Sequence, residues 1–262
     1  MSPLVFVSLL FLFLIDGSKG QLKMDFYSDT CFLAELIVHD VVREAALSDP
    51  TVPAGLLRLH FHDCFVEVYG PWYMVPTGRR DGFVSNKSLA DDMPDVSDSI
   101  QQLKTKFRNK GLTDKDLVLL SAAHTIGTTA CFFMKKRLYN FSPSGGGSDP
   151  AISPDFLPEL KAKCPRTGHE NDRLAMDITT ETTFDDNILK NIRKGFAVLE
   201  SDARLNDDAE TKAVIESYLA PFAPKLGPHF GFDFTQSIVK MGQIGVKTGS
   251  EGNIRRVCSK IH

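Results

Sequence analysis

The sequence lacks a concentration of charge of either sign. Its 262 residues carry 30 Lys and Arg against 33 Asp and Glu, which gives a net charge of −3, and no run of like charges stands out. A partner such as nucleic acid or an anionic membrane would require a concentrated basic surface. The charge balance therefore argues against both partners, and 42% apolar side chains in a chain of this length predict a globular protein with a sizeable core.

Long apolar runs are absent apart from one near the N-terminus. Residues 4–15 (LVFVSLLFLFLI) carry no charge, but this run is shorter than the roughly 20 residues that a membrane-spanning helix needs. Small residues, Ser18 and Gly20, stand at the −3 and −1 positions of a cut before Gln21. Residues 1–20 therefore predict a secretory signal peptide, with an N-terminal anchor as the alternative, and residues 21–262 form the mature domain.

Cysteine is scarce, and the number of cysteines is odd. The five are Cys31, Cys64, Cys131, Cys164 and Cys258. A secreted protein with an odd number keeps at least one thiol free or in an intermolecular bond. Two sequons, at Asn86 and Asn140, permit N-glycosylation where they are exposed.

Alternation with a period of two is also scarce, whereas apolar residues often recur at helical spacing, which predicts a mainly α fold. Helices are predicted over residues 31–47 and 52–65, and the prolines and glycines of residues 69–96 predict a loop. Further helices are predicted at 97–110, 113–123, 128–139, 154–163, 185–194, 207–221 and 232–242, with a short strand near 175–178.

The first segment that carries chemistry is RLHFHDCF at residues 58–65. On a helix Arg58 and His62 are four residues apart and project from the same face. A guanidinium and an imidazole are costly to bury on an otherwise apolar surface, which indicates a functional pair; two surface residues are the alternative. His60 projects from a different face of the helix. Two histidines that are two residues apart on a helix do not point toward the same zinc ion.

The second such segment is LSAAHTIG, in which His124 follows an apolar helix. A histidine there is favourably placed near the negative end of the helix dipole, so a capping or core histidine is one interpretation. The other is that His124 and His62, on separate helices, face one another across a cofactor. Composition and spacing leave both open.

Five segments together resemble the plant secretory (class III) haem peroxidases: RLHFHDCF, PTGRRDG, LSAAHTIG, RLYNFS and the tail MGQIGVKTGSEGNIRRVC. The match is collinear from Gln21 to Cys258. The resemblance implies a mainly α, two-lobed fold with haem b between the lobes. It also implies that His124 is the axial iron ligand and that Asp202 accepts a hydrogen bond from the other ring nitrogen.

The resemblance implies further roles around the haem. His62 would act first as general base and then as general acid on the peroxide, and Arg58 would stabilise the developing negative charge. Phe61 would shield the reacting oxygen, while Pro94 and Phe133 match substrate-contacting positions. A disulfide would join Cys131 and Cys164. A proximal calcium ion would take oxygen ligands from Thr125, Asp177, Thr180, Thr183 (through its carbonyl) and Asp185, although the polar loop alone is an alternative reading of these residues.

The sequence departs from the family after Val68, where Tyr69-Gly70-Pro71-Trp72 follows at once although the family shows this segment much later. The missing stretch leaves the distal lobe incomplete. Only Asp63 and the Val66 carbonyl remain of a distal calcium site, which is therefore expected to be empty. An asparagine that normally bonds the distal histidine is lost, so His62 is expected to be a weaker base. The partners of Cys31, Cys64 and Cys258 are lost as well.

The leading interpretation is a secreted, extracellular haem peroxidase of the cell wall or apoplast. It would be a monomer that reduces hydrogen peroxide and oxidises small phenolic donors, as in lignin-type oxidation or an oxidative stress response. The alternative is a catalytically impaired or non-enzymatic relative that binds haem or calcium. A more distant one is a structural wall protein bridged by its spare thiols. The shortening is explained by a skipped exon, a gene-model error or a genuine deletion.

Overall fold

The computed structural model describes residues 22–63, 74–84, 91–220 and 228–254, and for residues 61–63 it describes the backbone alone. The chain divides into two compact units. Unit 1 contains residues 1–37, 74–87 and 245–262, and unit 2 contains residues 38–73 and 88–244. Several predicted features lie outside the described residues: the predicted signal peptide, the Val68–Tyr69 junction, Cys64, Val66, Asn86 and Cys258.

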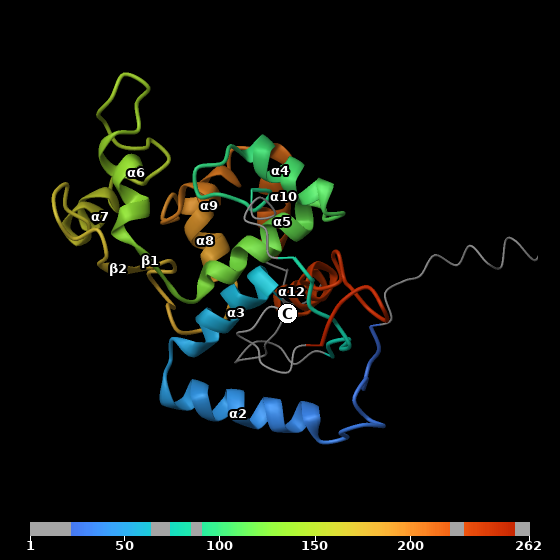
Figure 1. Ribbon diagram of the computed structural model, residues 1–262. Helices are drawn as coiled ribbons and strands as arrows, with labels where there is room; N and C mark the ends of the chain where they lie inside the picture. The colour runs from blue at the N-terminus through green and yellow to red at the C-terminus, as the bar shows by residue number, and fades with distance from the viewer. Residues whose placement is uncertain (1–21, 64–73, 85–90, 221–227, 255–262) are drawn as a thin grey trace, which may run out of the picture. The chain divides into compact units, whose positions relative to one another are not determined.

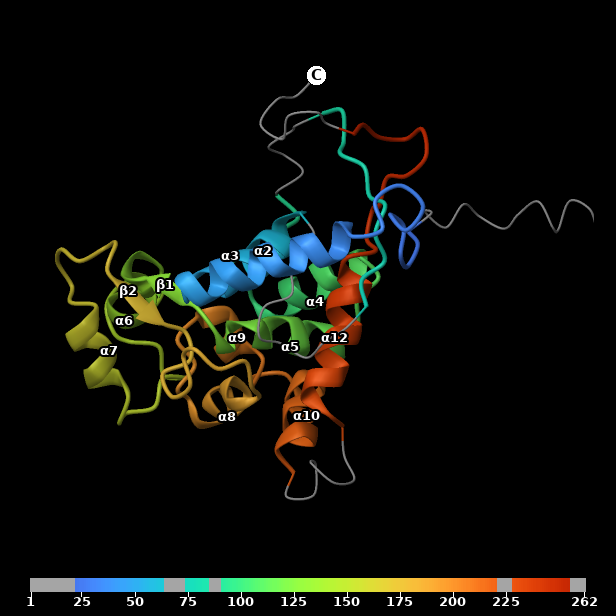
Figure 2. The same cartoon turned by 90° about the horizontal axis from the view of Figure 1, so that it is seen from below.

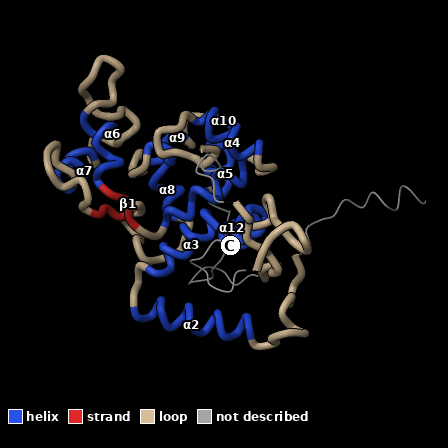
Figure 3. The backbone as a smooth tube through the Cα atoms, viewed as in Figure 1, coloured by secondary structure: helices blue, strands red, loops and turns tan. Residues whose placement is uncertain are grey.

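Helices make up most of the regular structure, so the prediction of a mainly α fold is confirmed (Figure 3). No helix in the described ranges is long and apolar enough to cross a membrane. The α-helices are α2 Ala34–Ser48, α3 Val52–Asp63, α4 Ile100–Asn109, α5 Asp114–Ser121, α6 Lys135–Tyr139, α7 Leu157–Lys163, α8 Asn187–Lys194, α9 Glu200–Arg204, α10 Ala209–Leu219 and α12 Phe230–Met241. The 3-10 helices are η2 Ala122–Thr125 and η3 Cys131–Met134, and the strands are β1 Thr128–Ala130 and β2 Arg173–Ala175.

The predicted helix at residues 128–139 is wrong over its first half. Residues 128–130 form β1, which pairs antiparallel with β2 so that Thr129 lies opposite Leu174. Two adjacent threonines favour an extended backbone because their branched side chains fit a strand better than a helix. The turn η3 then leads into α6, which begins only at Lys135.

Helix α5 lies at the centre of the main core of unit 2. It begins at a capping box in which Thr113 Oγ1 accepts from the Asp116 amide at 3.2 Å and Asp116 Oδ2 accepts from the Thr113 amide at 2.7 Å. Its Leu117, Val118 and Leu119 are fully buried in a core to which α4, α8, α10 and α12 also contribute. Helices α4, α10 and α12 contact α5 and lie beside it (Figure 1). Burial of each such side chain contributes about 1.5–3 kcal/mol. This packing fixes the end of α5 and therefore η2, which follows it directly.

A second core lies around α6, α7 and the two strands, which form one group in both views (Figure 1, Figure 2). Cys131 and Cys164 are joined by a disulfide that links η3 to the end of α7. Met134, Leu138 and Leu160 are fully buried beside it. This core fixes α6 as a rigid support, although α6 is only one and a half turns long.

In the described residues of unit 1, isolated bridges join Lys23 to Thr77 and Asp81 to Asn253. Gly78 has a φ of +106°, and a Cβ there would lie 2.7 Å from the Phe26 ring, so only glycine fits this position. Cys31 is exposed and forms no disulfide with another cysteine in the described part of the chain.

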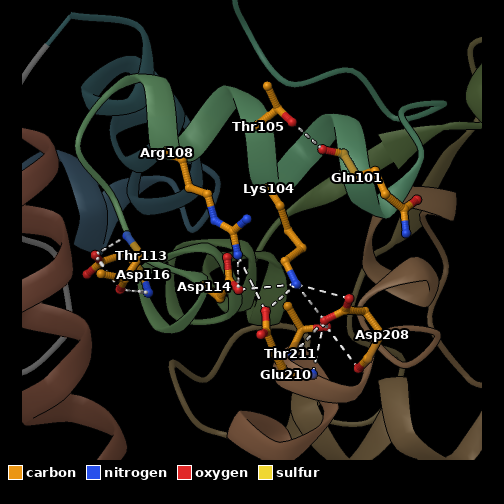
Figure 4. A network of polar contacts seen from close by, with 10 residues as sticks. All are labelled: Gln101, Lys104, Thr105, Arg108, Thr113, Asp114, Asp116, Asp208, Glu210 and Thr211. Carbon is orange, nitrogen blue, oxygen red and sulfur yellow. Dashed lines mark hydrogen bonds and ion pairs between the residues drawn. The ribbon is translucent and has the colours of Figure 1, made fainter.

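A network of charges joins α4 to the start of α10 (Figure 4). Lys104 Nζ lies 2.9 Å from Asp208 Oδ1, 2.6 Å from Glu210 Oε2 and 3.2 Å from Asp114 Oδ2. Although burial by itself lowers the pKa of Lys104, its hydrogen bonds to these carboxylates outweigh that effect and the pKa is raised. The hydrogen bond from Lys104 is the main reason why the pKa of Asp208 is lowered.

Removal of the Lys104 ammonium is expected to make the free energy of unfolding less dependent on pH in the acid range. Because the folded-state pKa of Asp208 is depressed, its contribution is present above the unfolded-state pKa of about 3.9 and is lost as the pH falls through the folded value. Lys104→Met should lower the free energy of unfolding by about 1–3 kcal/mol at pH 7. The deficit should shrink at pH 3, as measured by urea unfolding. Lys212→Met, at an exposed lysine of α10, is the control; a deficit of the same size at both pH values would contradict the prediction.

Candidate active site

His124 lies on η2, directly after the buried helix α5. Its Nδ1 is 3.0 Å from both carboxylate oxygens of Asp202, which lies on α9 and is 1% exposed. The His124 side chain is 34% exposed. Since Nδ1 is engaged by the carboxylate, Nε2 is the ring nitrogen that remains for a ligand.

Asp202 controls the protonation of this imidazole. Burial by itself lowers the pKa of His124, but the negative charge of Asp202 and its hydrogen bond outweigh burial, so the pKa is raised. A carboxylate on Nδ1 also fixes the tautomer and adds electron density to the ring. The pair is therefore suited to a histidine that donates strongly to a metal through Nε2.

A cluster of oxygen atoms lies immediately beside His124. Thr125 Oγ1 is 3.2 Å from Asp185 Oδ1, 3.4 Å from Asp177 Oδ2 and 3.5 Å from the Thr183 carbonyl. Thr180 Oγ1 is 3.1 Å from Asp185 Oδ1 and 3.4 Å from Asp177 Oδ2. Most of these separations exceed those of good O–H···O hydrogen bonds, as expected for oxygens that surround a common centre. Five hard oxygen donors, two of them carboxylates, fit the ligand preference of calcium.

Two asparagines of α8 hold this cluster. They were not predicted as site residues from the sequence. Asn191 Nδ2 donates to Asp177 Oδ1 at 2.9 Å, and Asn187 Nδ2 donates to the same oxygen at 3.2 Å. The amide of Thr179 also donates to Oδ1. Asp177 Oδ1 thus accepts from several N–H donors, while Oδ2 lies near the hydroxyls of Thr125 and Thr180 and, at 3.4 Å, near Asn187 Nδ2. The i, i+4 spacing of Asn187 and Asn191 was the available signal.

Helix α3 carries Arg58 and lies close to the His124 segment within unit 2. A Cβ on Gly127, whose φ is +94°, would lie 2.8 Å from the Ala54 Cβ of α3, so glycine permits this close approach. Leu57 packs against the core around α5, His60 is buried and Arg58 is exposed. The side chains of Phe61, His62 and Asp63 lie outside the described part of the structure, as does Val66.

The predicted donor-contacting residues lie on separate elements. Pro94 is half-buried in the segment before α4. Phe133, on η3, is 47% exposed, and its ring packs edge-to-face with that of Phe132 at a centroid distance of 5.3 Å. The structure thus brings together His124, Asp202 and the oxygen cluster, whereas the described contacts do not join Arg58, Pro94 or Phe133 to them.

Comparison with known proteins assigns the family. The family model described as Peroxidase matches residues 67–221. Peroxidase 43 of Arabidopsis thaliana is 51% identical over 303 aligned positions, which cover 92% of this chain and 93% of the relative. The chain belongs to the peroxidase family. Peroxidase 13 of Arabidopsis thaliana is 41% identical with 92% and 93% coverage, and Peroxidase N1 of Nicotiana tabacum is 38% identical with 92% and 90% coverage.

The alignment of this peroxidase with Peroxidase 43 is longer than the chain itself. It has 303 positions against 262 residues, so at least 41 positions, the difference between the two numbers, have no residue here. The family model begins its match at residue 67, immediately before Val68. This peroxidase therefore covers 93% of its relative with fewer residues than the alignment has positions.

Proposed function

We propose that this peroxidase binds haem b through His124 Nε2 and uses hydrogen peroxide to oxidise small aromatic donors. The observation that carries the proposal is the contact of His124 Nδ1 with both oxygens of the buried Asp202 at 3.0 Å. When bound, haem supplies the redox-active iron at which peroxide is reduced. The donor set fits this group because a neutral imidazole, oriented by a carboxylate, is a suitable axial ligand for haem iron.

Different residues would hold the haem ligand, transfer protons and contact the donor. Asp202 holds the proton at His124 Nδ1 and keeps the ring oriented. On α3, His62 would accept a proton from the peroxide and return it to the departing oxygen. Arg58, one turn before His62, would stabilise the negative charge on that oxygen. Phe61 would exclude water from the reacting atoms, and Pro94 and the exposed ring of Phe133 would contact the aromatic donor.

The oxygen cluster is proposed to bind one calcium ion through Thr125, Asp177, Thr180, Asp185 and the Thr183 carbonyl. Because Thr125 follows His124 directly, an ion there would fix the backbone of the ligand histidine. The remnant of a second site, Asp63 and the Val66 carbonyl, is proposed to be empty because two oxygens are far fewer than the six to eight that calcium takes.

Calcium removal is expected to destabilise the protein. A ligand that binds only the folded state stabilises it by about 2.7 kcal/mol at 100 times its Kd. Addition of EGTA to the haem-free protein should therefore lower its unfolding midpoint, and calcium should restore it. Asp177→Asn should abolish this response, whereas Asp155→Asn, at an exposed aspartate, should retain it. An unfolding midpoint that does not change on addition of EGTA would contradict the assignment of a calcium site.

An internal stretch is proposed to be missing between Val68 and Tyr69, with the distal side of the haem site incomplete. The excess of aligned positions supports this, and so do the exposed apolar side chains of Val41, Leu47 and Leu59 on α2 and α3. A catalytically impaired relative that still binds haem or calcium is the alternative function. We also propose that the protein is secreted to the apoplast and is a monomer.

Haem uptake by the purified mature protein tests the function. Titration with hemin should give a Soret band at one equivalent, and His124→Ala should abolish it. His169→Ala is the matched control, because His169 also pairs with an aspartate, Asp172, but is 57% exposed. Oxidation of a phenolic donor by the loaded protein and peroxide supports the enzyme, whereas haem uptake without turnover supports the impaired relative. A protein that takes up no hemin refutes both.

A further inference from the structure

A buried guanidinium lies behind the Asp202 helix. Arg137, on α6, is 1% exposed, and its Nε donates to Asp149 Oδ2 at 2.7 Å. Its NH1 donates to the Val198 carbonyl at 2.6 Å, to the Ala197 carbonyl and, at 3.4 Å, to the Leu199 carbonyl. These three carbonyls belong to the segment that leads into α9, and Leu199 is the N-cap of that helix.

Asp149 connects the same guanidinium to the other end of α9. It is fully buried, and its Oδ2 also accepts from Arg204 NH2 at 2.8 Å. Arg204 is the last residue of α9. Asp149 thus contacts both Arg137, which binds the carbonyls directly before α9, and Arg204, the last residue of α9.

Helix α9 depends on such external contacts. It has five residues, too few for a helix that is stable by itself. Asp202 is its third residue, and its contact with His124 requires the helix to be held to within a few tenths of an ångström. Helix α6, which carries Arg137, is itself fixed by the core that contains the disulfide. The position of Asp202 is therefore determined by groups that do not touch His124.

We propose that Arg137, Asp149 and Arg204 form a clamp on α9 that positions Asp202 against His124 and so sets the electron density of the imidazole. All three are positioning residues, since their effect passes through Asp202. The proposal rests on the proposed function, in which His124 binds the haem iron. A weaker Asp202–His124 hydrogen bond makes the imidazole a poorer donor, which destabilises ferric relative to ferrous iron.

The test measures the Fe(III)/Fe(II) midpoint potential and the ferrous iron–histidine stretching frequency of the haem-loaded protein. Arg137→Lys keeps the positive charge but not the fork that reaches both Asp149 and the carbonyls. Arg204→Gln removes the second contact at a partly exposed position, so it is the variant that folds if Arg137→Lys does not. Both should raise the potential and lower the stretching frequency. For Arg137→Lys we expect the ferrous-to-ferric ratio at fixed potential to rise about ten-fold, which is about 59 mV for a one-electron couple.

Lys135→Met is the matched control. Lys135 is on the same helix, and its ammonium also binds three loop carbonyls, those of Pro165, Arg166 and Gly168. That loop does not carry Asp202, so this variant should leave both spectroscopic quantities unchanged even where it lowers the unfolding temperature. If both clamp variants are folded and have the potential and stretching frequency of wild type, the clamp is purely structural and the proposal is overturned.

Nitrogen NMR of the His124 ring in the haem-free protein separates this proposal from the proposed function. The Nδ1 signal should shift toward that of a weaker hydrogen bond in Arg137→Lys and Arg204→Gln but not in Lys135→Met. If wild type binds no haem, the proposed function fails while this measurement still supports or overturns the clamp.

Discussion

His62→Leu is expected to slow the reaction of the haem-loaded protein with hydrogen peroxide by roughly 10²–10⁴-fold. A positioned general base removes the proton from the attacking peroxide oxygen, and the same group, once protonated, neutralises the oxygen that leaves. Leucine has a similar volume but neither accepts nor donates a proton. The rate constant is measured by stopped-flow absorption of the haem band against peroxide concentration, so the donor step does not contribute.

Two companion variants sharpen this test. His39→Leu, at an exposed histidine of α2 that pairs with Asp40, should react at the wild-type rate. Arg58→Leu should lose about 10²–10³-fold, the usual effect of one group that stabilises developing charge. If His62→Leu reacts as fast as His39→Leu, the base is another group or water. Because at least 41 aligned positions are missing, a wild-type rate already close to that of His62→Leu would indicate the impaired relative.

The parts of the fold that follow from local signals could be predicted from the sequence. The capping pair Thr113 and Asp116 lies within one helical turn, so its geometry is set by neighbouring residues, and the helix begins where the pattern indicates. The buried run after it fixes η2 and therefore His124. The carboxylates Asp177 and Asp185 lie on one short polar loop; the family resemblance named them as calcium ligands, and their residue type fits that role.

The groups that support the site could not be predicted in this way. Arg137 reaches Asp149 across 12 residues and the Val198 carbonyl across 61, and nothing in RLYNFS itself shows that the arginine is buried. The error at residues 128–139 has a related cause. The two threonines favour an extended backbone, but a strand also needs a pairing partner, and Arg173–Ala175 provides it 45 residues later. In both cases the decisive contact is remote in sequence, and a periodicity argument contains no information about it.

Asp149→Ala should give the largest loss of stability, about 3–5 kcal/mol, because it leaves the buried Arg137 without its carboxylate. Burial by itself raises the pKa of Asp149, but its contacts with Arg137, the Ala151 amide and Arg204 outweigh burial and lower it, so the carboxylate is charged at neutral pH. Against a total stability of about 5–15 kcal/mol, this loss should be evident in the urea midpoint of the haem-free protein.

Asp207→Ala is the control for Asp149→Ala, because Asp207 binds the same arginine, Arg204, at 2.7 Å but is 42% exposed. Loss of an exposed ion pair costs about 0–1 kcal/mol, so the two variants should differ by several fold although each removes one carboxylate from Arg204. Equal losses of stability would mean that the carbonyls of residues 197–199 stabilise the buried Arg137 well enough without the Asp149 carboxylate. In that case the carbonyls, rather than Asp149, hold the guanidinium behind α9.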